Sequence, residues 1–398
     1  MQAVTSRAPA ANAPPRTGRR SPVAPALVLL CGLLAGALGC QQHDDEIRIG
    51  EFGSLTGGTA TFGTSSHEGT MLAVDEINAS GGLLGKKVQV ITEDNQSKPE
   101  ESVTAVLKLI KQNQVVAVIG EVASSRTLAA APQCQANHIP MISPASTNPK
   151  VTEVGDYIFR ACFIDPFQGA TMAKFAIDDL HAKRIAILTD TKNDYSVGLA
   201  HFFRETVKRL GGEIVAEESY SEGDIEFKAQ LTAIKADNPD VIYVPGYYTE
   251  CALIARQARE LGIQATLLGG DGWDSPKTVE IGGKAVEGVY FTNHYSPEDQ
   301  RPEVQKFIAD YKTKYDGKTP DAMAVLGYDA MNMMADAIRR AGSTDGAKVR
   351  DALAATKDFP GVSGRISMDA DRNASKAIVV LQIRDGHFHF VKSIAPDA

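Results

Sequence analysis

Four polar segments each follow a short apolar run, and their residue types suit the binding of a small dipolar solute. They are residues 121–127, 143–147, 246–249 and 269–274. The first segment opens a predicted helix, whose free backbone N–H groups, with the Ser124 hydroxyl, would bind a carboxylate. The last places Asp271 in a glycine-rich loop, where its acid would bind an ammonium group. An acid facing hydroxyls across a cleft predicts a site for a zwitterion.

The apolar runs that precede these segments are predicted strands of parallel sheets. Residues 115–119 form an unbroken, mostly β-branched run, which is typical of a strand buried on both faces and covered by crossover helices. A second series of such runs begins after Pro166 and comprises residues 185–188, 241–244, 265–268 and 288–291. Two series in one chain predict an α/β protein with two doubly wound lobes, each with a parallel-sheet core, joined by a hinge.

The two lobes are expected to share several chain crossings, because no proline-rich, serine-rich or low-complexity linker separates them. We expect residues 44–162 and 294–362 to form lobe 1, and residues 163–293 and 363–398 to form lobe 2. Open α/β sheets bind ligands at the carboxyl ends of their strands. The cleft between the lobes is therefore the expected site.

Residues 1–39 have the features of an export signal. Three arginines between positions 16 and 20 precede a nearly uncharged apolar run over residues 23–38, which is short for a membrane span. Small residues before Cys40 resemble a bacterial lipoprotein processing site, although leucine usually stands where this chain has Ala37. We expect a lipoprotein-type signal peptide cleaved before Cys40, acylation of Cys40, and a protein anchored to the membrane in the periplasm or at the cell surface. The alternative is an ordinary cleaved signal peptide and a soluble product.

The net charge argues against a nucleic-acid partner. The chain carries 41 bases and 49 acids, a formal charge of −8 at pH 7. Residues 1–39 contain four arginines and no acid, so the remainder carries 37 bases and 49 acids, a net charge of −12. A chain this acidic is repelled by phosphate backbones.

The sequence lacks the motifs of an enzyme or a metalloprotein. It contains no Gly-x-Ser-x-Gly or other nucleophile and base motif, and its eight histidines form no metal-ligand pair with an acid. Residues 81–87 are glycine-rich but lack the spacing of a phosphate loop. Cys134, Cys162 and Cys251 are expected to be free thiols. These patterns favour a binding protein without a cofactor or a metal.

The whole chain resembles the periplasmic branched-chain amino acid-binding proteins of ABC importers, which are type I periplasmic binding proteins for leucine, isoleucine and valine. The resemblance extends from Ile47 to about Ile394, and its strength comes from the order and spacing of several motifs. These are residues 56–58, 81–86, 120–127, 142–147, 195–198, 246–247 and 269–273. The resemblance implies two α/β lobes that close on a ligand.

The resemblance also implies seven ligand-binding residues, which are Phe62, Ser124, Ala145, Thr147, Tyr195, Tyr247 and Asp271. Ser124 and Thr147 would hold the ligand carboxylate. The Ala145 carbonyl, the Thr147 hydroxyl and Asp271 would hold the ammonium group. Tyr195 and Tyr247 would contribute from the second lobe, and Phe62 would line the cleft from the first.

Three departures from the leucine-binding pattern leave the ligand's side chain open. Asp271 replaces a glutamate, which retracts the acid. Ser97 and Ala123 stand where those relatives carry a disulfide. Trp273, beside the acid, either shapes the pocket or belongs to the core. Local sequence also favours a helix-cap role for Ser125.

The expected function is capture of a small amino acid, branched-chain or similar, for import. Binding would bias a hinge equilibrium toward a closed form, which the permease of an ABC importer in the cytoplasmic membrane would recognise. We expect a monomer. The alternative is a ligand-binding sensor or chemoreceptor component of the same fold that responds to amino acids or amides.

Overall fold

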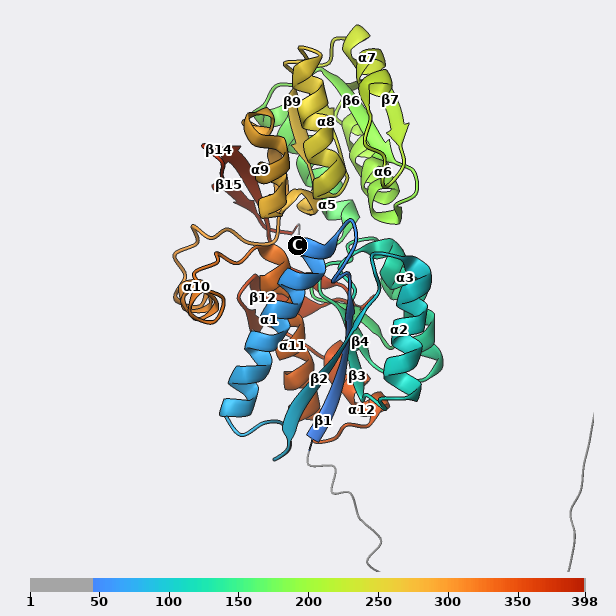
Figure 1. Cartoon of the computed structure of the whole chain (residues 1–398), viewed down its shortest axis with the longest axis vertical. Helices are drawn as coiled ribbons and strands as arrows, with labels where there is room; N and C mark the ends of the chain where they lie inside the picture. Colours follow the sequence, from blue (N-terminus) through green and yellow to red (C-terminus); the bar gives the residue numbers. More distant parts are fainter. Residues whose placement is uncertain (1–45, 397–398) are drawn as a thin grey trace, which may run out of the picture. The chain divides into compact units, whose positions relative to one another are not determined.

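The computed structural model describes residues 46–396, which fold into two α/β lobes (Figure 1). The expected export signal and the acylation of Cys40 lie outside the described residues and stay predictions. In the part that is described, no helix is both long and apolar enough to span a membrane.

Lobe 1 is built on a five-stranded parallel sheet with the order β2-β1-β3-β4-β5. The strands are β1 (Glu46–Gly53), β2 (Lys87–Asp94), β3 (Ala117–Ile119), β4 (Met141–Ser143) and β5 (Ile158–Arg160). The helices are α1 (Ala60–Ala79), α2 (Pro99–Lys111), α3 (Ser124–Ala136), α4 (Lys150–Glu153), α10 (Pro302–Lys314), α11 (Ala322–Ala341) and α12 (Gly346–Ala354). Ile49 packs with α1 and α11 on one face, whereas Val118 packs with α2 and α3 on the other. Because both faces are covered, the strands are continuous apolar runs.

Lobe 2 is built on a seven-stranded sheet with the order β15-β14-β10-β9-β8-β6-β7. The strands are β6 (Arg184–Asp190), β7 (Glu213–Tyr220), β8 (Val241–Tyr243), β9 (Thr266–Gly269), β10 (Tyr290–Asn293), β14 (Ile378–Arg384) and β15 (His387–Ile394). The first five are parallel, and β14 and β15 are antiparallel additions at one edge. The helical segments are α5 (Asp165–Lys174), η1 (Phe175–Asp179), α6 (Asp194–Arg209), α7 (Lys228–Ala236), α8 (Tyr248–Glu260), η2 (Asp271–Trp273), α9 (Pro276–Gly282) and η3 (Gly283–Val286). The expected fold class, two α/β lobes with parallel-sheet cores, is confirmed.

A short antiparallel sheet, β11-β12-β13, follows α12. Its strands are β11 (Phe359–Gly361), β12 (Gly364–Met368) and β13 (Ala374–Ser375). The sequence assigns residues 363–375 to lobe 2, but Ile366, Met368 and Ala374 pack in a core cluster of lobe 1. We therefore propose that lobe 1 extends to residue 375. The chain then passes between the lobes three times, after β5, after β10 and after β13.

Two glycines allow α1 and α11 to pack closely. A Cβ atom on Gly69 would lie 1.8 Å from the Ala324 carbonyl oxygen, and one on Gly327 would lie 2.2 Å from that of Ser66. This contact fixes the starts of both helices, which carry Phe62 and Met323 into a cluster shared with lobe 2.

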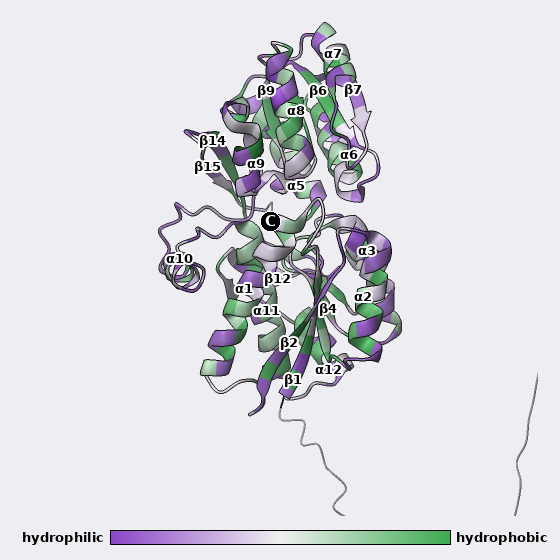
Figure 2. Ribbon diagram, viewed as in Figure 1, coloured by the Kyte–Doolittle hydropathy of each residue, from purple (hydrophilic) through white to green (hydrophobic). Residues whose placement is uncertain are grey.

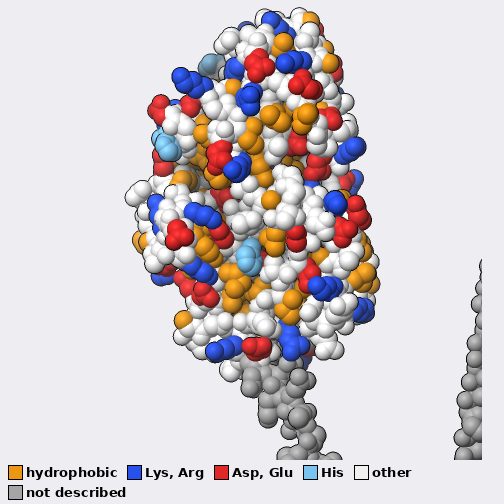
Figure 3. Space-filling model, viewed as in Figure 1, with side chains coloured by type: hydrophobic (Ala, Val, Ile, Leu, Met, Phe, Trp, Pro, Cys, Tyr) orange, Lys and Arg blue, Asp and Glu red, His pale blue; other side chains and the backbone are white. Residues whose placement is uncertain are grey.

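Apolar residues are concentrated on the strands and inner helix faces of both lobes (Figure 2). On the face displayed in Figure 3, bases and acids are interspersed. Charged side chains elsewhere among the described residues form solvent-accessible pairs, such as Arg204 with Glu217 and Lys306 with Asp310. Exposed pairs contribute little to stability, so burial of the apolar residues dominates.

Candidate functional site

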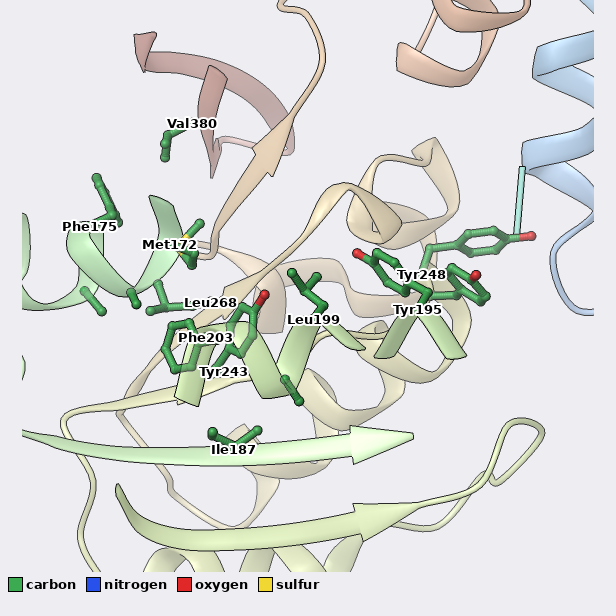
Figure 4. Packing of buried hydrophobic residues seen from close by; sticks show 14 of the residues in the cluster. Met172, Phe175, Ile187, Tyr195, Leu199, Phe203, Tyr243, Tyr248, Leu268 and Val380 are labelled. Carbon is green, nitrogen blue, oxygen red and sulfur yellow. The ribbon is translucent and has the colours of Figure 1, made fainter. Parts of the chain in front are cut away.

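One buried cluster contains side chains from both lobes (Figure 4 shows part of it). Among its members are Phe62, Val122, Ala123 and Ala145 from lobe 1, and Tyr195, Tyr247 and Tyr248 from lobe 2. The Phe62 ring lies edge-on to two tyrosines, with centroids 5.5 Å from Tyr247 and 4.9 Å from Tyr248. Tyr247 also stacks on Tyr195 at 5.3 Å. The structure thus brings together Phe62, Ala145, Tyr195 and Tyr247 from the sequence-predicted set.

Hydrogen bonds hold the two lobes against each other around this cluster. The Tyr248 hydroxyl accepts from the backbone N–H of Thr61 at 3.2 Å and from its hydroxyl at 3.0 Å, and in Figure 4 the Tyr248 ring points toward α1. Asn148 Nδ2 donates to the Asp194 carbonyl at 2.7 Å, and Arg126 pairs with Glu222. These bonds join lobe 1 to lobe 2, so the structure is a closed form.

Removing the Tyr248 hydroxyl is expected to weaken closure. Tyr248→Phe deletes an acceptor that Thr61 uses only when the lobes touch, whereas water can replace it in an open form. One hydrogen bond contributes about 1 kcal/mol, so we expect ligand affinity to fall about fivefold in calorimetric titrations. Tyr290→Phe removes a hydroxyl elsewhere in lobe 2 and is the matched control. Unchanged affinity in Tyr248→Phe would show that this contact does not favour closure.

Ser124 and Ser125 begin α3, which points its N-terminus toward lobe 2. Ser124 is 1% exposed, and its hydroxyl accepts from the Asn148 N–H at 3.3 Å. Ser125, expected to be a helix cap, instead accepts from the Asp194 N–H at 2.8 Å and so bridges the lobes. The residue before α3 is Ala123, which offers no side-chain cap. The first-turn N–H groups and the Ser124 hydroxyl together suit a carboxylate.

The first turn of α5 connects Thr147 with Asp271. The Asp165 N–H donates to the Thr147 carbonyl at 3.0 Å, and Gln168 Nε2 donates to Asp271 Oδ1 at 2.7 Å. Residues three apart share one face of a helix, so Thr147 and Asp271 lie near the same turn. Thr147 is fully buried, and its hydroxyl has no hydrogen-bond partner within residues 46–396.

The Asp271 carboxylate is buried and held by two donors. It is 3% exposed and accepts from Gln168 on one oxygen and from His294 Nε2, 3.0 Å away, on the other. Burial lowers the pKa of His294 to about 4 against the opposing pull of Asp271, so His294 is neutral and the pair is not an ion pair. His294 also stacks on Phe163 at 3.8 Å. Neutral donors orient the Asp271 charge without cancelling it, which leaves the acid able to attract a cation.

Asp165, Gln168 and His294 are site residues that sequence reasoning missed. Asp165 and Gln168 follow β5, so they occupy the same kind of strand-end position as the four polar segments. Their position at the start of a helix opened by Asp165-Pro166 was the available signal. His294 follows β10 in the same way. Across residues 46–396, no His, Cys, Asp and Glu group is arranged to hold a metal ion.

Trp273 belongs to the core of lobe 2 and not to the pocket. Its side chain is 0% exposed, and it packs in the cluster formed by α7, α8 and the strand faces turned toward them. The indole N–H donates to the Val244 carbonyl at 2.9 Å. Trp273 therefore anchors η2, which also carries Asp271.

The fold and the buried cross-lobe site define a two-lobed solute-binding protein. A family model described as "Periplasmic binding protein" matches residues 46–387, and the chain belongs to this family. Members of the family bind solutes outside the cytoplasm and are not enzymes, and this applies to the present chain.

Similar proteins narrow the group within the family. The leucine-, isoleucine-, valine-, threonine- and alanine-binding protein of Pseudomonas aeruginosa is 31% identical, over 84% of this chain and 89% of its own. The crystal structure of the leucine-binding protein LivK from Thermotoga maritima is 43% identical with a TM-score of 0.84, covering 88% of this chain and 99% of that one. The isoleucine complex of LivJ from Streptococcus pneumoniae is 36% identical with a TM-score of 0.84, covering 88% and 100%. The chain is a member of the branched-chain amino acid-binding group, as the resemblance implied.

Proposed function

We propose that this protein captures a branched-chain or similar aliphatic amino acid outside the cytoplasmic membrane and presents it, lobes closed, to the permease of an ABC importer. The observation that carries the proposal is the buried cross-lobe cluster, together with the first turn of α5, to which both Thr147 and Asp271 are hydrogen-bonded. The named solutes of the relatives, among them the isoleucine bound to LivJ, support the same class of ligand.

The two ends of an α-amino acid fit opposite parts of this site. We propose that Ser124, Thr147 and the N-terminus of α3 bind the carboxylate, because hydroxyls and free N–H groups stabilise an anion. Asp271, with the Ala145 carbonyl and the Thr147 hydroxyl, would bind the ammonium group. A zwitterion satisfies both halves at once, which favours closure over binding to either lobe alone.

The ligand side chain would lie against the apolar part of the cluster. Phe62, Val122 and Ala123 enter it from lobe 1 and Tyr247 from lobe 2, and Tyr195 closes the site with its hydroxyl accepting from the Gly272 N–H at 3.1 Å. Burying an aliphatic side chain there contributes about 1.5–3 kcal/mol. This apolar lining favours leucine, isoleucine or valine over a polar amino acid.

Acylation of Cys40 would keep the protein near its permease. We propose that the protein is lipid-anchored, on the grounds of the small residues that precede Cys40 and the basic and apolar stretch before them. Metabolic labelling with a fatty-acid analogue tests the anchor, and Cys40→Ser should abolish the label.

A thermal-shift screen tests the proposed ligand class. We expect leucine, isoleucine and valine to raise the melting temperature of residues 41–398. A ligand that binds only the folded form and is present at about 100 times its Kd adds about 2.7 kcal/mol to the free energy of unfolding. The matched controls are the leucine analogues that lack either the amine or the carboxylate, which should raise the melting temperature far less. Stabilisation by the amine-free carboxylate alone would overturn the assignment of an amino acid.

A further inference from the structure

A second buried acid lies at this site. Asp165 is the first residue of α5 and 0% exposed. Within residues 46–396, neither of its carboxyl oxygens makes a hydrogen bond of ordinary length. Buried polar groups nearly always have partners, because an unpaired one has lost its water and gained nothing. An unpaired buried carboxyl beside Thr147 and Asp271 is therefore placed to bind a group that the ligand supplies.

The neighbours of Asp165 are the residues assigned to the ammonium group. The Thr147 hydroxyl faces Asp165 and favours its ionised form as a hydrogen-bond donor would. It makes no hydrogen bond of ordinary length within residues 46–396. The Asp271 acid is near enough to repel a charge on Asp165. On the side of α6, a Cβ atom on Gly198 would lie 3.2 Å from Asp165 Oδ2, so the absence of a side chain there leaves the acid its room.

We propose that Asp165 is a second carboxyl of the ammonium subsite, which binds the charged nitrogen of the ligand together with Asp271 and Thr147 and releases one proton to solvent as the ligand enters. The proposal rests on the proposed function, because Asp165 can form an ion pair only with a ligand that carries a cationic group. In the empty site the Asp165 O–H bond is intact. On binding, this bond breaks, the proton passes to the buffer, and the carboxylate left behind pairs with the ammonium group.

The electrostatics around Asp165 support a neutral acid in the empty site. The pKa of Asp165 is raised to about 8, mainly by burial and also by the Asp271 charge, against the opposing effects of Thr147 and Arg160. The other titratable neighbours are Cys162, Tyr195 and Tyr243, whose own pKa values burial raises, so they stay neutral near pH 7. Asp165 and Asp271 repel each other when both are charged, and Arg160 offsets this repulsion only in part, because the pKa of Asp165 stays raised. A bound ammonium group would add a second cation and so favour the ionised form of both acids.

The sign of the pH dependence follows from this linkage. Above about pH 8 the empty site is already ionised at Asp165, so affinity for the ligand does not depend on this group. Below about pH 8 a proton must leave, so affinity falls by up to about tenfold per pH unit until the pKa of the occupied site is reached.

Counting protons in the wild-type protein tests the proposal without any variant. Leucine, isoleucine and valine are titrated calorimetrically at about pH 6.5 in two buffers with different ionisation enthalpies. The difference between the apparent binding enthalpies gives the number of protons exchanged, and we expect about one released per ligand. Binding with no net release would overturn the role of Asp165 and leave the proposed function standing. No binding of any of the three would overturn both.

The variant Asp165→Asn tests whether the proton released on ligand binding comes from Asp165. This variant keeps the shape of the side chain but carries no titratable proton, so release should drop to near zero and the pH dependence should flatten. We expect affinity at about pH 8 to fall between tenfold and a hundredfold, because one charged hydrogen bond is lost. Asp316→Asn, an exposed acid, is the matched control, and the melting temperature of each variant checks folding. Proton release that persists in Asp165→Asn would assign it to another group and overturn the proposal.

Discussion

Replacing Asp271 with asparagine is expected to weaken the binding of an amino acid by about a hundredfold or more. The substitution removes a buried negative charge that Gln168 and the neutral His294 orient but do not neutralise. Breaking a buried ion pair by removing one partner costs about 3–5 kcal/mol, because the other charge stays desolvated and unpaired. Isothermal titration with the tightest-binding amino acid of the screen measures the loss.

The matched control for this prediction is again Asp316→Asn, which makes the same chemical change on the surface. It should bind like wild type. The melting temperature of unliganded Asp271→Asn should stay within a few degrees of wild type, since an amide fills the same space. An affinity loss below about threefold in Asp271→Asn would remove Asp271 from the ligand site.

Trp273→Ala is expected to lower the free energy of unfolding by about 3–5 kcal/mol. Trp273 is fully buried, donates to the Val244 carbonyl, and packs so closely that a Cβ atom on Gly269 would lie 2.2 Å from its ring. Truncation would leave a cavity that the rigid strands β8 and β9 cannot fill. Urea unfolding followed by circular dichroism measures the loss, because Trp273 is the chain's one tryptophan and its fluorescence disappears with it.

Trp273→Phe separates the packing of the ring from the anchoring of η2. It keeps most of the buried area, and the Val244 carbonyl still accepts from the Gly246 N–H at 3.0 Å. We expect this variant to lose about 1–2 kcal/mol. Equal destabilisation by alanine and phenylalanine would mean that the indole hydrogen bond, and not the volume of the ring, stabilises this part of lobe 2.

The sequence predicts the central strands of the two large sheets better than the short strands of the small sheet β11-β12-β13. Unbroken apolar runs such as residues 115–119 and 241–244 are strong signals, since burial on both faces demands them. The strands β12 and β13 are short, and Ile366 and Met368 show only that one face is buried. Nothing local determines which lobe supplies the opposite surface. The packing of Ile366, Met368 and Ala374 in a lobe 1 cluster therefore supports the proposed assignment of residues 363–375 to lobe 1.

The residues of the candidate site also differ in how well the sequence predicts them. Thr147 and Asp271 lie in segments rich in glycine or hydroxyl groups at strand ends, which makes them recognisable. Gln168 and His294 also follow strands, but no glycine-rich or hydroxyl-rich segment surrounds them, and only the fold places both beside Asp271. Trp273 is the opposite case. It is close to Asp271 along the chain, but its ring packs in the core of lobe 2 and does not belong to the site.

The three passages of the chain between the lobes have a mechanical consequence. A single tether would let one lobe swivel freely, but three tethers spaced along the chain resist torsion and leave bending as the easy motion. The buried Lys376 stiffens the last tether through its bond to Ser363, and Asp274 fastens the start of α11 at 2.6 Å through the Ala322 N–H. Lobes restrained in this way would return to the same relative orientation in every cycle of opening and closing. Each arriving solute would therefore meet two lobes that are already aligned for closure.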